Sequence, residues 1–433
     1  MASENLPDSR RFIRDDRAHD RVMKGGSGSD PIPRLMRGAE PVEAVMVRYG
    51  EVFLKSERVK RRFVSTMAEN IALALEAQGL AHRIETPRGR IIIYGDDPAR
   101  IAAAAARVFG VVSASVCTVT KPEIGVITAA ALERAERRLR PGMSFAVRAR
   151  RSGVPGFSSQ ELAAAVGSAI LERVDGARVD LTRPDYEVNV EAKEFGGLVY
   201  DDKIPGPGGL PYGTQGEVVS LLSAGIDSPV ASWLMMRRGC RMLHLNMHGG
   251  RFEGGDVERN VLENHARLSS WVPGHALDLL VVDMEPFFEV ITALKEPRYR
   301  CVLCKRFMLR VAGILAGEQG AHAIVTGDNL GQVASQTLAN MAVISAATTL
   351  PLLRPLIGFD KEEVVERARS IGTFEARPGD VGCAVAPRYP STAAPAETIA
   401  RIEEEIDAPG LARRAAASVR RYRAKNGVLE EVG

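Results

Sequence analysis

Residues 218–235 place a turn of small and polar residues between an apolar, strand-like run and a helix-like pattern. The turn reads SAGIDS from Ser223 to Ser228. Ser228 is a favourable N-cap and Pro229 suits a first helical turn, so we expect a helix to begin there. A helix N-terminus offers unpaired N–H groups, and the serines and Gly225 leave hydroxyl groups and room for phosphate oxygens. The turn therefore predicts a phosphate-binding site.

This turn differs from a Walker A loop, because it contains no lysine and no Gly-Lys-Ser/Thr ending. Asp227 instead suits a Mg²⁺-binding or polarising role near the phosphates. The turn follows the strand-like run EVVSLL, and the carboxyl ends of strands are where open α/β sheets bind their ligands.

The chain has five cysteines, an odd number in a sequence without a secretion signal. A disulfide scaffold is therefore not expected. Cys117 and Cys240 lie in strand-like apolar runs and are predicted to be small core residues. The other three, Cys301, Cys304 and Cys383, require a separate explanation.

Cys301 and Cys304 are three residues apart, which on a helix places both sulfurs on one face. Lys305, Arg306 and the helix N-terminus would favour thiolates there. Paired thiolates can bind a metal, but zinc requires four ligands and no fourth thiol of the right kind is evident. Cys383 stands in the loop-like stretch GDVGCAVAPRYP.

The composition is that of a globular chain with more than one domain. A length of 433 residues is too great for one ordinary core, and 45% hydrophobic and 26% charged residues are globular values. No apolar run is long enough to span a membrane, and the polar residues 1–40 are expected to form a disordered extension. We therefore expect a cytoplasmic location and no membrane partner. The net charge of +3 is compatible with RNA binding but does not indicate it.

Two small α+β units are expected before a Pro- and Gly-rich segment. Strand and helix patterns alternate over residues 42–108 and again over residues 123–203. The segment IPGPGGLPYGTQG, residues 204–216, should continue neither helix nor sheet and is interpreted as a linker. Beyond it, strands alternate with helices, which indicates a doubly wound parallel sheet. These helices are expected to begin near residues 229, 257, 301, 331 and 360.

Three pieces then occur in order: LLSAGIDSPVASWLMMRRG, CVLCKRFMLRVA and TGDNLGQVASQTLANM. Together they resemble the tRNA 4-thiouridine synthetase family, also called tRNA uridine 4-sulfurtransferase. Upstream, VRYGEVFLKS resembles the start of that family's ferredoxin-like domain. The pieces FAVRARR, FSSQELAAAVGSAI, VDLTRPDYEVNVEA and KIPGPGGLPYGTQG resemble its THUMP domain and linker. The resemblance covers residues 42–425.

The resemblance implies a multidomain α/β protein. Its expected parts are a disordered extension over 1–40, a ferredoxin-like α+β domain over 41–110, a THUMP α+β domain over 111–203, a linker over 204–216, a doubly wound PP-loop ATP pyrophosphatase domain over 217–400 and a helical tail over 401–433.

The resemblance also implies which residues bind ATP. The turn corresponds to the family's Ser-Gly-Gly-x-Asp-Ser loop, with Asp227 in a catalytic role beside Mg²⁺. The implied ATP contacts are Leu221, Leu222, Ser223, Gly225, Asp227, Ser228, Leu245, Asn246, Lys305, Gly327 and Gln336. Taken singly, Leu245 could be a core residue, Gly327 a turn glycine and Gln336 a polar helix residue. Ala224 stands where the family commonly has glycine, and its methyl group would cost about 1–2 kcal/mol if φ were positive.

For the sulfur, the resemblance implies a catalytic Cys383 and the CxxC-containing type of the family. Cys301, Cys304 and Cys383 would hold a [4Fe-4S] or [3Fe-4S] cluster. A Cys301/Cys304 redox pair, a Cys383 persulfide and purely structural cysteines are the alternatives. The chain has no room after Cys383 for a rhodanese-like domain, to which a role in thiamine synthesis is tied in bacterial members. The sulfur donor would be sulfide or a cysteine desulfurase.

The resemblance implies that tRNA binds through its acceptor stem and 3′ end, held by phosphate contacts. The candidate RNA-binding residues are Arg148, Arg150, Arg151 and Lys203. The basic clusters over residues 55–62 and 134–151 could equally be solvated surfaces. The C-terminal run LARRAAASVRRYRAK is interpreted as an amphipathic surface helix.

The expected function is ATP-dependent adenylation of uridine 8 in tRNA, followed by replacement of O4 with sulfur to give 4-thiouridine. The family suggests a homodimer. One alternative is a PP-loop adenylating ligase that acts on a small metabolite, although such an enzyme has no use for a THUMP-like module. The other is a non-catalytic THUMP RNA-binding protein, which Asp227, Ser228 and Lys305 argue against.

Overall fold

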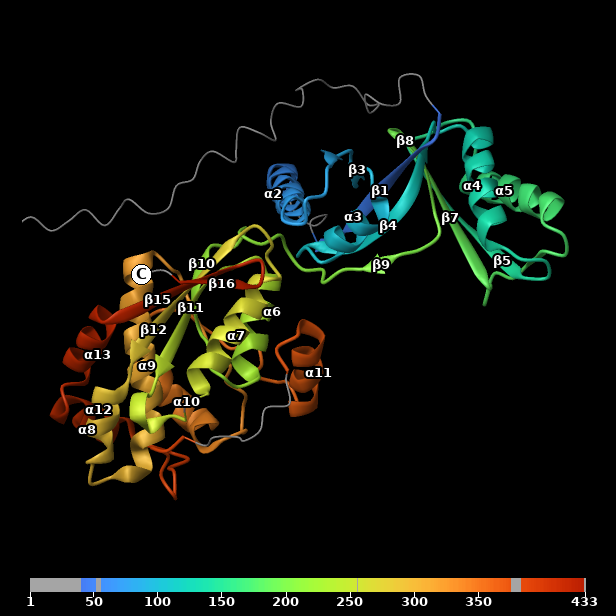
Figure 1. Ribbon diagram of the computed structural model, residues 1–433. Coiled ribbons are helices and arrows are strands. Elements are labelled where there is room, and N and C mark those ends of the chain that lie inside the picture. Colours follow the sequence, from blue (N-terminus) through green and yellow to red (C-terminus); the bar gives the residue numbers. More distant parts are fainter. Residues whose placement is uncertain (1–39, 52–55, 255, 375–382, 432–433) are drawn as a thin grey trace, which may run out of the picture. The chain divides into compact units, whose positions relative to one another are not determined.

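The structure is a computed structural model that describes residues 40–51, 56–254, 256–374 and 383–431 (Figure 1). The extension predicted over residues 1–40 lies outside this range except for residue 40. The chain divides into two compact units, one containing Val119–Val199 and the other combining Glu43–Thr118 with Tyr200–Gly433. No helix in the described ranges is long and apolar enough to cross a membrane.

The unit around Val119–Val199 packs two helices on a small sheet. Its elements are α4 (Ile124–Arg138), β5 (Ser144–Ser152), α5 (Ser159–Arg173), β6 (Arg178–Val179), β7 (Tyr186–Lys193) and β8 (Gly196–Tyr200). Strand β5 pairs in parallel with both β6 and β7. Helix α5 begins with a capping box between Ser158 and Glu161. Its buried residues pack with the inner face of β5 and β7.

The second unit starts with another α+β part, built from β1 (Val42–Tyr49), α2 (Glu57–Glu76), β2 (Arg83–Glu85), β3 (Ile91–Tyr94), α3 (Pro98–Ala106) and β4 (Val111–Thr120). The strand order is β2-β3-β1-β4, with antiparallel pairing of β1 with β3 and of β2 with β3. In the predicted linker, β9 (Ile204–Pro205) pairs with β4, so these two residues do continue a sheet.

The rest of the second unit is the doubly wound domain. Its strands are β10 (Glu217–Leu221), β11 (Arg241–His248), β12 (Ala276–Asp283), β13 (Ile324–Val325), β14 (Leu352–Leu353), β15 (Val419–Lys425) and β16 (Val428–Glu431). Its α-helices are α6 (Asp227–Arg237), α7 (Val257–Ser269), α8 (Glu285–Thr292), α9 (Arg300–Gln319), α10 (Leu338–Ser345), α11 (Lys361–Ile371), α12 (Ala396–Glu405) and α13 (Ala408–Ala417). Three short 3₁₀ helices are η4 (Gly250–Phe252), η5 (Pro297–Tyr299) and η6 (Ala334–Gln336).

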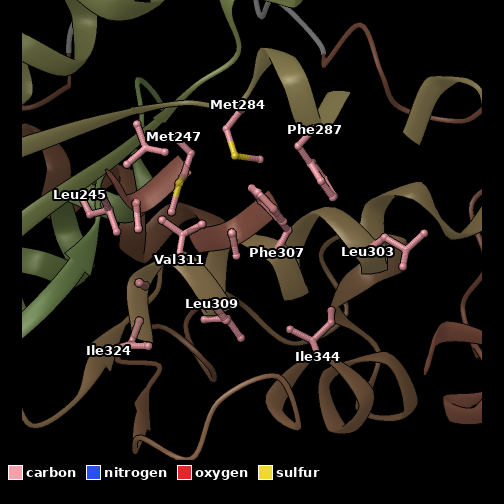
Figure 2. Close-up of a cluster of buried hydrophobic side chains, with 14 of the residues drawn as sticks. Leu245, Met247, Met284, Phe287, Leu303, Phe307, Leu309, Val311, Ile324 and Ile344 are labelled. Carbon is pink, nitrogen blue, oxygen red and sulfur yellow. The ribbon is translucent and has the colours of Figure 1, made fainter. Parts of the chain in front are cut away.

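The sheet order is β14-β13-β10-β11-β12-β15-β16, and the first five strands pair in parallel. Both faces of this sheet are apolar. Helices α6, α7 and α11 lie on one side of the sheet, and α8, α9, α12 and α13 lie on the other (Figure 1). Along β12, Leu277, Leu279 and Val281 pack with the first group, whereas Leu280 and Val282 pack with the second. Figure 2 shows the second of these cores, in which Phe307 and Val311 of α9 lie near Leu245 and Met247 of β11. The two covered faces explain the nearly continuous hydrophobic strands.

Two sequence predictions in this domain are wrong. The helix expected near Gly331 is a loop, and α10 begins only at Leu338, with the Thr337 side chain as its N-cap. The helical tail predicted over 401–433 forms only α12 and α13. The later part of the basic run becomes β15 and β16, where β15 pairs antiparallel with β12 and closes that edge of the parallel strands.

Cys117 and Cys240 are buried, as predicted.

Three histidines are held neutral inside this unit. His244 and His265 are fully buried, with their Nδ1 atoms 2.8 Å apart. Burial lowers the pKa of His265 to about 4 and holds the pKa of His244 well below its usual range. Burial likewise lowers the pKa of His275 to about 4; its Nε2 lies 2.9 Å from Asn70 Oδ1.

These shifts predict acid destabilisation. The unfolded chain, with histidine pKa values near 6.5, binds more protons than the folded chain between about pH 6.5 and pH 4. Stability is therefore full above about pH 7 and falls by about 1 kcal/mol per histidine by pH 5.5. Urea unfolding followed by tryptophan fluorescence checks this, since both tryptophans, Trp233 and Trp271, lie in this unit. The variant His275→Asn should have a shallower pH dependence, and an unchanged slope would contradict the explanation.

Candidate functional site

The phosphate-type turn lies at the carboxyl edge of the parallel strands. Leu221 ends β10 and is in register with Leu245 of β11. The Leu222 N–H donates to the Leu245 carbonyl at 2.9 Å, and the Asn246 side-chain amide donates to the Leu222 carbonyl at 2.9 Å. Strand pairing and one side-chain hydrogen bond thus bring together four residues that are predicted to contact ATP, namely Leu221, Leu222, Leu245 and Asn246.

Ser228 holds the turn, but it is not the N-cap that the sequence predicts. Helix α6 begins one residue earlier, at Asp227, and the residue before it caps the helix without a side-chain hydrogen bond. The Ser228 hydroxyl accepts a hydrogen bond from the Ser223 N–H at 2.8 Å and lies 3.0 Å from the Ser223 hydroxyl. The Gly225 N–H donates to the Ser223 hydroxyl at 3.3 Å. These bonds close the turn around the helix N-terminus.

Ala224 is compatible with this turn. Among the described non-glycine residues, only Asp407 and Asn426 have positive φ. Residue 224 therefore does not need the left-handed conformation, and its methyl group adds little strain. Ala224 also packs against the core beneath α6.

Gly327 follows β13 and directly contacts the start of α6. A Cβ atom at this position would lie 2.9 Å from the Ser228 backbone nitrogen and 3.1 Å from the Asp227 carbonyl carbon. Both are backbone atoms, so no side-chain movement could relieve the contact. Glycine is required here because two segments of main chain meet beside the turn.

Asp328, the next residue, is the centre of a polar network. Its carboxylate accepts hydrogen bonds from Lys305 Nζ at 2.6 Å, Thr326 Oγ1 at 2.8 Å and Gln336 Nε2 at 3.3 Å. Arg354 Nε lies 3.4 Å away, and the Asp328 side chain is only 13% exposed. Burial alone would raise the pKa of Asp328, but the Lys305 ammonium and these hydrogen bonds hold it below its usual range.

A second ion pair reaches the turn from α11. Lys361 Nζ lies 2.7 Å from Asp227 Oδ1, in the first turn of α6. The site therefore contains three cations, Lys305, Arg354 and Lys361, opposite two carboxylates. Such a surplus of positive charge at a helix N-terminus suits an anionic ligand.

The three candidate sulfur residues come from two segments, the start of α9 and the segment that begins at Cys383. Cys301 and Cys304 are on the first turns of α9 and are partly buried, while Cys383 is exposed. Burial raises the pKa of both helix thiols, and the nearby Cys383 sulfur raises them further. These shifts disfavour the thiolates that the sequence predicts, because burial outweighs the effect of Lys305 and the Arg306 guanidinium binds Glu403 at 2.6 Å. Within the described ranges, no three His, Cys, Asp or Glu side chains form a preassembled metal site.

Three parts of the chain match known families. Residues 213–408 match the thiamine biosynthesis protein (ThiI) family, residues 44–115 the ThiI ferredoxin-like domain and residues 123–200 the THUMP domain. A protein named probable tRNA sulfurtransferase from Methanothermobacter thermautotrophicus is 39% identical over 371 residues, which cover 84% of this chain and 94% of that protein. The chain belongs to the tRNA sulfurtransferase family.

Further members of the tRNA sulfurtransferase family agree with this assignment. A protein of the same name from Thermococcus kodakarensis is 40% identical over 341 residues, which cover 76% of this chain and 88% of that protein. A solved structure described as a 4-thiouridine synthetase–RNA complex with bound ATP has 30% identity and a TM-score of 0.78, covering 88% of this chain and 99% of that chain. The predicted family and the fold with ferredoxin-like, THUMP and PP-loop parts are confirmed.

The candidate RNA-binding residues of this family member do not all lie on one surface of one unit. Arg148 and Arg150 point to one face of β5, and Arg151 points to the other, because side chains alternate along a strand. Arg148 pairs with Glu187 at 2.9 Å. Lys203 belongs to the other unit, where its ammonium lies 5.8 Å from the centre of the Tyr200 ring. Their contact with RNA stays a prediction.

Sequence reasoning missed Asp328, Arg354 and Lys361. Asp328 was visible in the motif TGDNLGQ, beside the predicted Gly327. Arg354 directly follows β14, so the rule that ligands bind at carboxyl ends of strands could have found it. Lys361 had no such signal, because a lysine in the first turn of a helix is usually a surface residue.

Proposed function

We propose that this protein is an ATP-dependent sulfurtransferase that adenylates uridine 8 of tRNA and replaces its O4 with sulfur, giving 4-thiouridine. One observation carries the proposal. Cys304 directly precedes Lys305 on α9 and Cys301 lies one helical turn before Lys305, whose ammonium bonds Asp328 beside the phosphate-type turn. A nucleotide site and a sulfur site therefore share one end of one helix.

The turn from Ser223 to Ser228 binds the pyrophosphate part of ATP. The similar 4-thiouridine synthetase structure contains bound ATP, which supports this assignment. Gln336 is compatible with a nucleotide ligand, because its buried Oε1 atom has no donor among the described residues and could accept from an amino or hydroxyl group of ATP. Mg²⁺ fits Asp227, since this ion is usually held by one or two carboxylates together with substrate phosphates.

The reaction has two displacements. Uridine O4 attacks the α-phosphorus of ATP, the bond to the β-phosphate oxygen breaks, and pyrophosphate leaves. The N–H groups at the start of α6, with Lys305, Arg354 and Lys361, stabilise the charge on that leaving group. A sulfur nucleophile then attacks C4, and the C4–O bond breaks to release AMP.

For sulfur delivery we propose an iron–sulfur cluster of the [4Fe-4S] or [3Fe-4S] type. Cys301, Cys304 and Cys383 are the right donors for three of its corners, and metal binding would release their thiol protons. When bound, a [4Fe-4S] cluster held by these three cysteines would supply one iron position open to sulfide. A persulfide on Cys383 or a Cys301/Cys304 redox pair is the competing route.

The proposal includes the partners and the place of action. The THUMP domain with Arg148, Arg150 and Arg151 binds the acceptor stem and 3′ end of tRNA, and Lys203, just after that domain, adds a further contact. Sulfide or a cysteine desulfurase supplies the sulfur, and the enzyme acts in the cytoplasm as a homodimer. We keep the domain ranges given in the Sequence analysis as part of the proposal. The one change is that β15 and β16 replace part of the helical tail.

The function is tested by exchange of labelled pyrophosphate into ATP. We expect exchange that requires tRNA, because uridine O4 is the group that is adenylated. Exchange without tRNA would favour the small-metabolite ligase, and no exchange would favour the RNA-binding protein.

Cys383→Ser should keep the exchange and lose thiolation, and retained thiolation would contradict the role of Cys383.

Asp328→Asn tests the polar network. Asparagine keeps the shape of the side chain but cannot neutralise Lys305 and Arg354, so we expect kcat/KM for adenylation to fall at least about tenfold. The matched control is Asp278→Asn, which removes an exposed carboxylate 2.7 Å from Arg423 on the sheet and should change the rate less than about twofold. Equal rates in both variants would contradict a positioning role for Asp328.

Anaerobic purification followed by iron and sulfide analysis tests the cluster. We expect iron and acid-labile sulfide in the wild-type protein and their loss in Cys301→Ser. Cys240→Ser is the control, because Cys240 is buried elsewhere in the core and should leave the iron content unchanged. An iron-free protein that still thiolates tRNA would exclude the cluster and favour the Cys383 persulfide.

A further inference from the structure

The segment after Cys383 exposes an aromatic ring close to the sulfur residues. Tyr389 is 74% exposed, the largest value among the exposed large hydrophobic side chains of the described residues. The Arg388 guanidinium lies 5.3 Å from the centre of its ring. A tyrosine normally buries most of its ring, so a ring left in solvent suggests a binding role.

The backbone on both sides of Tyr389 is held in place. Val385 is buried in the core that contains α9. The Ser391 N–H donates to the Arg298 carbonyl at 2.9 Å, and the Ser391 carbonyl accepts from the buried Asn340 amide at 2.8 Å. The Asn340 side-chain oxygen accepts from the Ala394 N–H at 2.9 Å. The exposed ring therefore projects from an anchored segment and not from a free tail.

This anchoring places the ring at the sulfur end of the site. Arg298 belongs to η5, directly before the helix that carries Cys301. Cys383 begins the same segment, and its carbonyl accepts a hydrogen bond from the Ala386 N–H at 3.0 Å. Tyr389 therefore lies in a segment that begins at Cys383 and is bonded to the residues directly before the helix that carries Cys301.

Two arginines add positive charge to this surface, Arg388 beside the Tyr389 ring and Arg298 where the segment is anchored, with its guanidinium 4.7 Å from the centre of the Tyr299 ring. Arg298 and Arg388 are both exposed, and neither forms an ion pair with a carboxylate among the described residues. An exposed aromatic ring beside unneutralised guanidinium groups is the combination that binds unpaired nucleotides, by stacking on the base and attraction of the phosphates. A protein partner that docked through an apolar face would not require both cations.

We propose that Tyr389, with Arg298 and Arg388, is a stacking site for an unpaired nucleotide of the RNA at the entrance to the sulfur-transfer site. This inference rests on the proposed function, since it adds an RNA contact in the catalytic domain to those of the THUMP domain. Enzymes that act on a base take it out of the stack, and an aromatic side chain compensates for the lost stacking. Tyr389 thus presents the target base, or its neighbour, to the cysteines.

The test compares Tyr389→Ala, Tyr389→Phe and the control Val428→Ala, which removes an exposed apolar side chain from β16. We expect Tyr389→Ala to raise KM for tRNA in thiolation with sulfide about 10- to 100-fold while leaving KM for ATP unchanged. Tyr389→Phe should behave like the wild-type protein, because the ring and not the hydroxyl stacks. Unfolding temperatures of all three variants should match the wild type, since neither position is buried.

A second measurement does not depend on turnover. tRNA that carries 4-thiouridine at position 8 is irradiated with the wild-type protein, and the crosslinked peptide is identified by mass spectrometry. A crosslink to the peptide containing Tyr389 supports the proposal. Wild-type KM for tRNA in Tyr389→Ala, or crosslinks only within the THUMP domain, would overturn it.

Two further outcomes separate this inference from the proposed function. A wild-type protein that crosslinks through Tyr389 but shows no tRNA-dependent pyrophosphate exchange would overturn the function and keep the RNA site. A defect of Tyr389→Ala that appears with a cysteine desulfurase and disappears with sulfide would show that the surface binds the donor protein, which overturns the RNA assignment.

Discussion

The ion pair between Lys305 and Asp328 is the contact on which the geometry of the site depends. Lys305 follows Cys304 on α9, and Asp328 follows Gly327 after β13. Since Gly327 lies directly against the first turn of α6, this one carboxylate connects the sulfur-bearing helix to the phosphate-type turn. The Asp328 side chain is only 13% exposed, and leaving it without its cations would cost several kcal/mol of folding free energy. The ion pair therefore holds α9 at a fixed distance from the phosphate-type turn.

The ion pairs also define how the site is charged before a ligand arrives. Asp227 and Asp328 neutralise two of the three cations, and Lys361 is the most exposed of these cations at 49%. The cations are thereby held in place without ligand and need little rearrangement when it binds.

The sheet below the site is what makes this arrangement rigid. Its parallel strands are covered on both faces, and α9 belongs to the larger of the two cores. In that core Phe287 and Phe307 stack with ring centres 3.9 Å apart, and Arg306 and Arg310 both bind the buried Glu403 of α12. These core contacts hold the start of α9 in place, while its thiols remain near the exposed Cys383.

Local patterns in the sequence determined much of this protein. Strand and helix periodicity predicted the doubly wound sheet, the turn SAGIDS predicted a phosphate-type site, and the ordered motifs identified the family. These features depend on neighbouring residues, so they can be recognised without long-range contacts. The C-terminal strands could not be predicted this way, because the arginine-rich residues of β15 form a strand only by pairing with β12.

Only the tertiary structure decided how the site residues work. Ser228 closes its turn because Ser223 is positioned to donate to it, a contact that the N-cap interpretation did not anticipate. The Cys301 and Cys304 thiols have raised pKa values because burial outweighs the basic neighbours that the sequence displays. Lys361 reaches Asp227 across 134 positions of the chain. Burial and long-range electrostatics depend on which segments the fold brings together, and that information is not contained in any one stretch of residues.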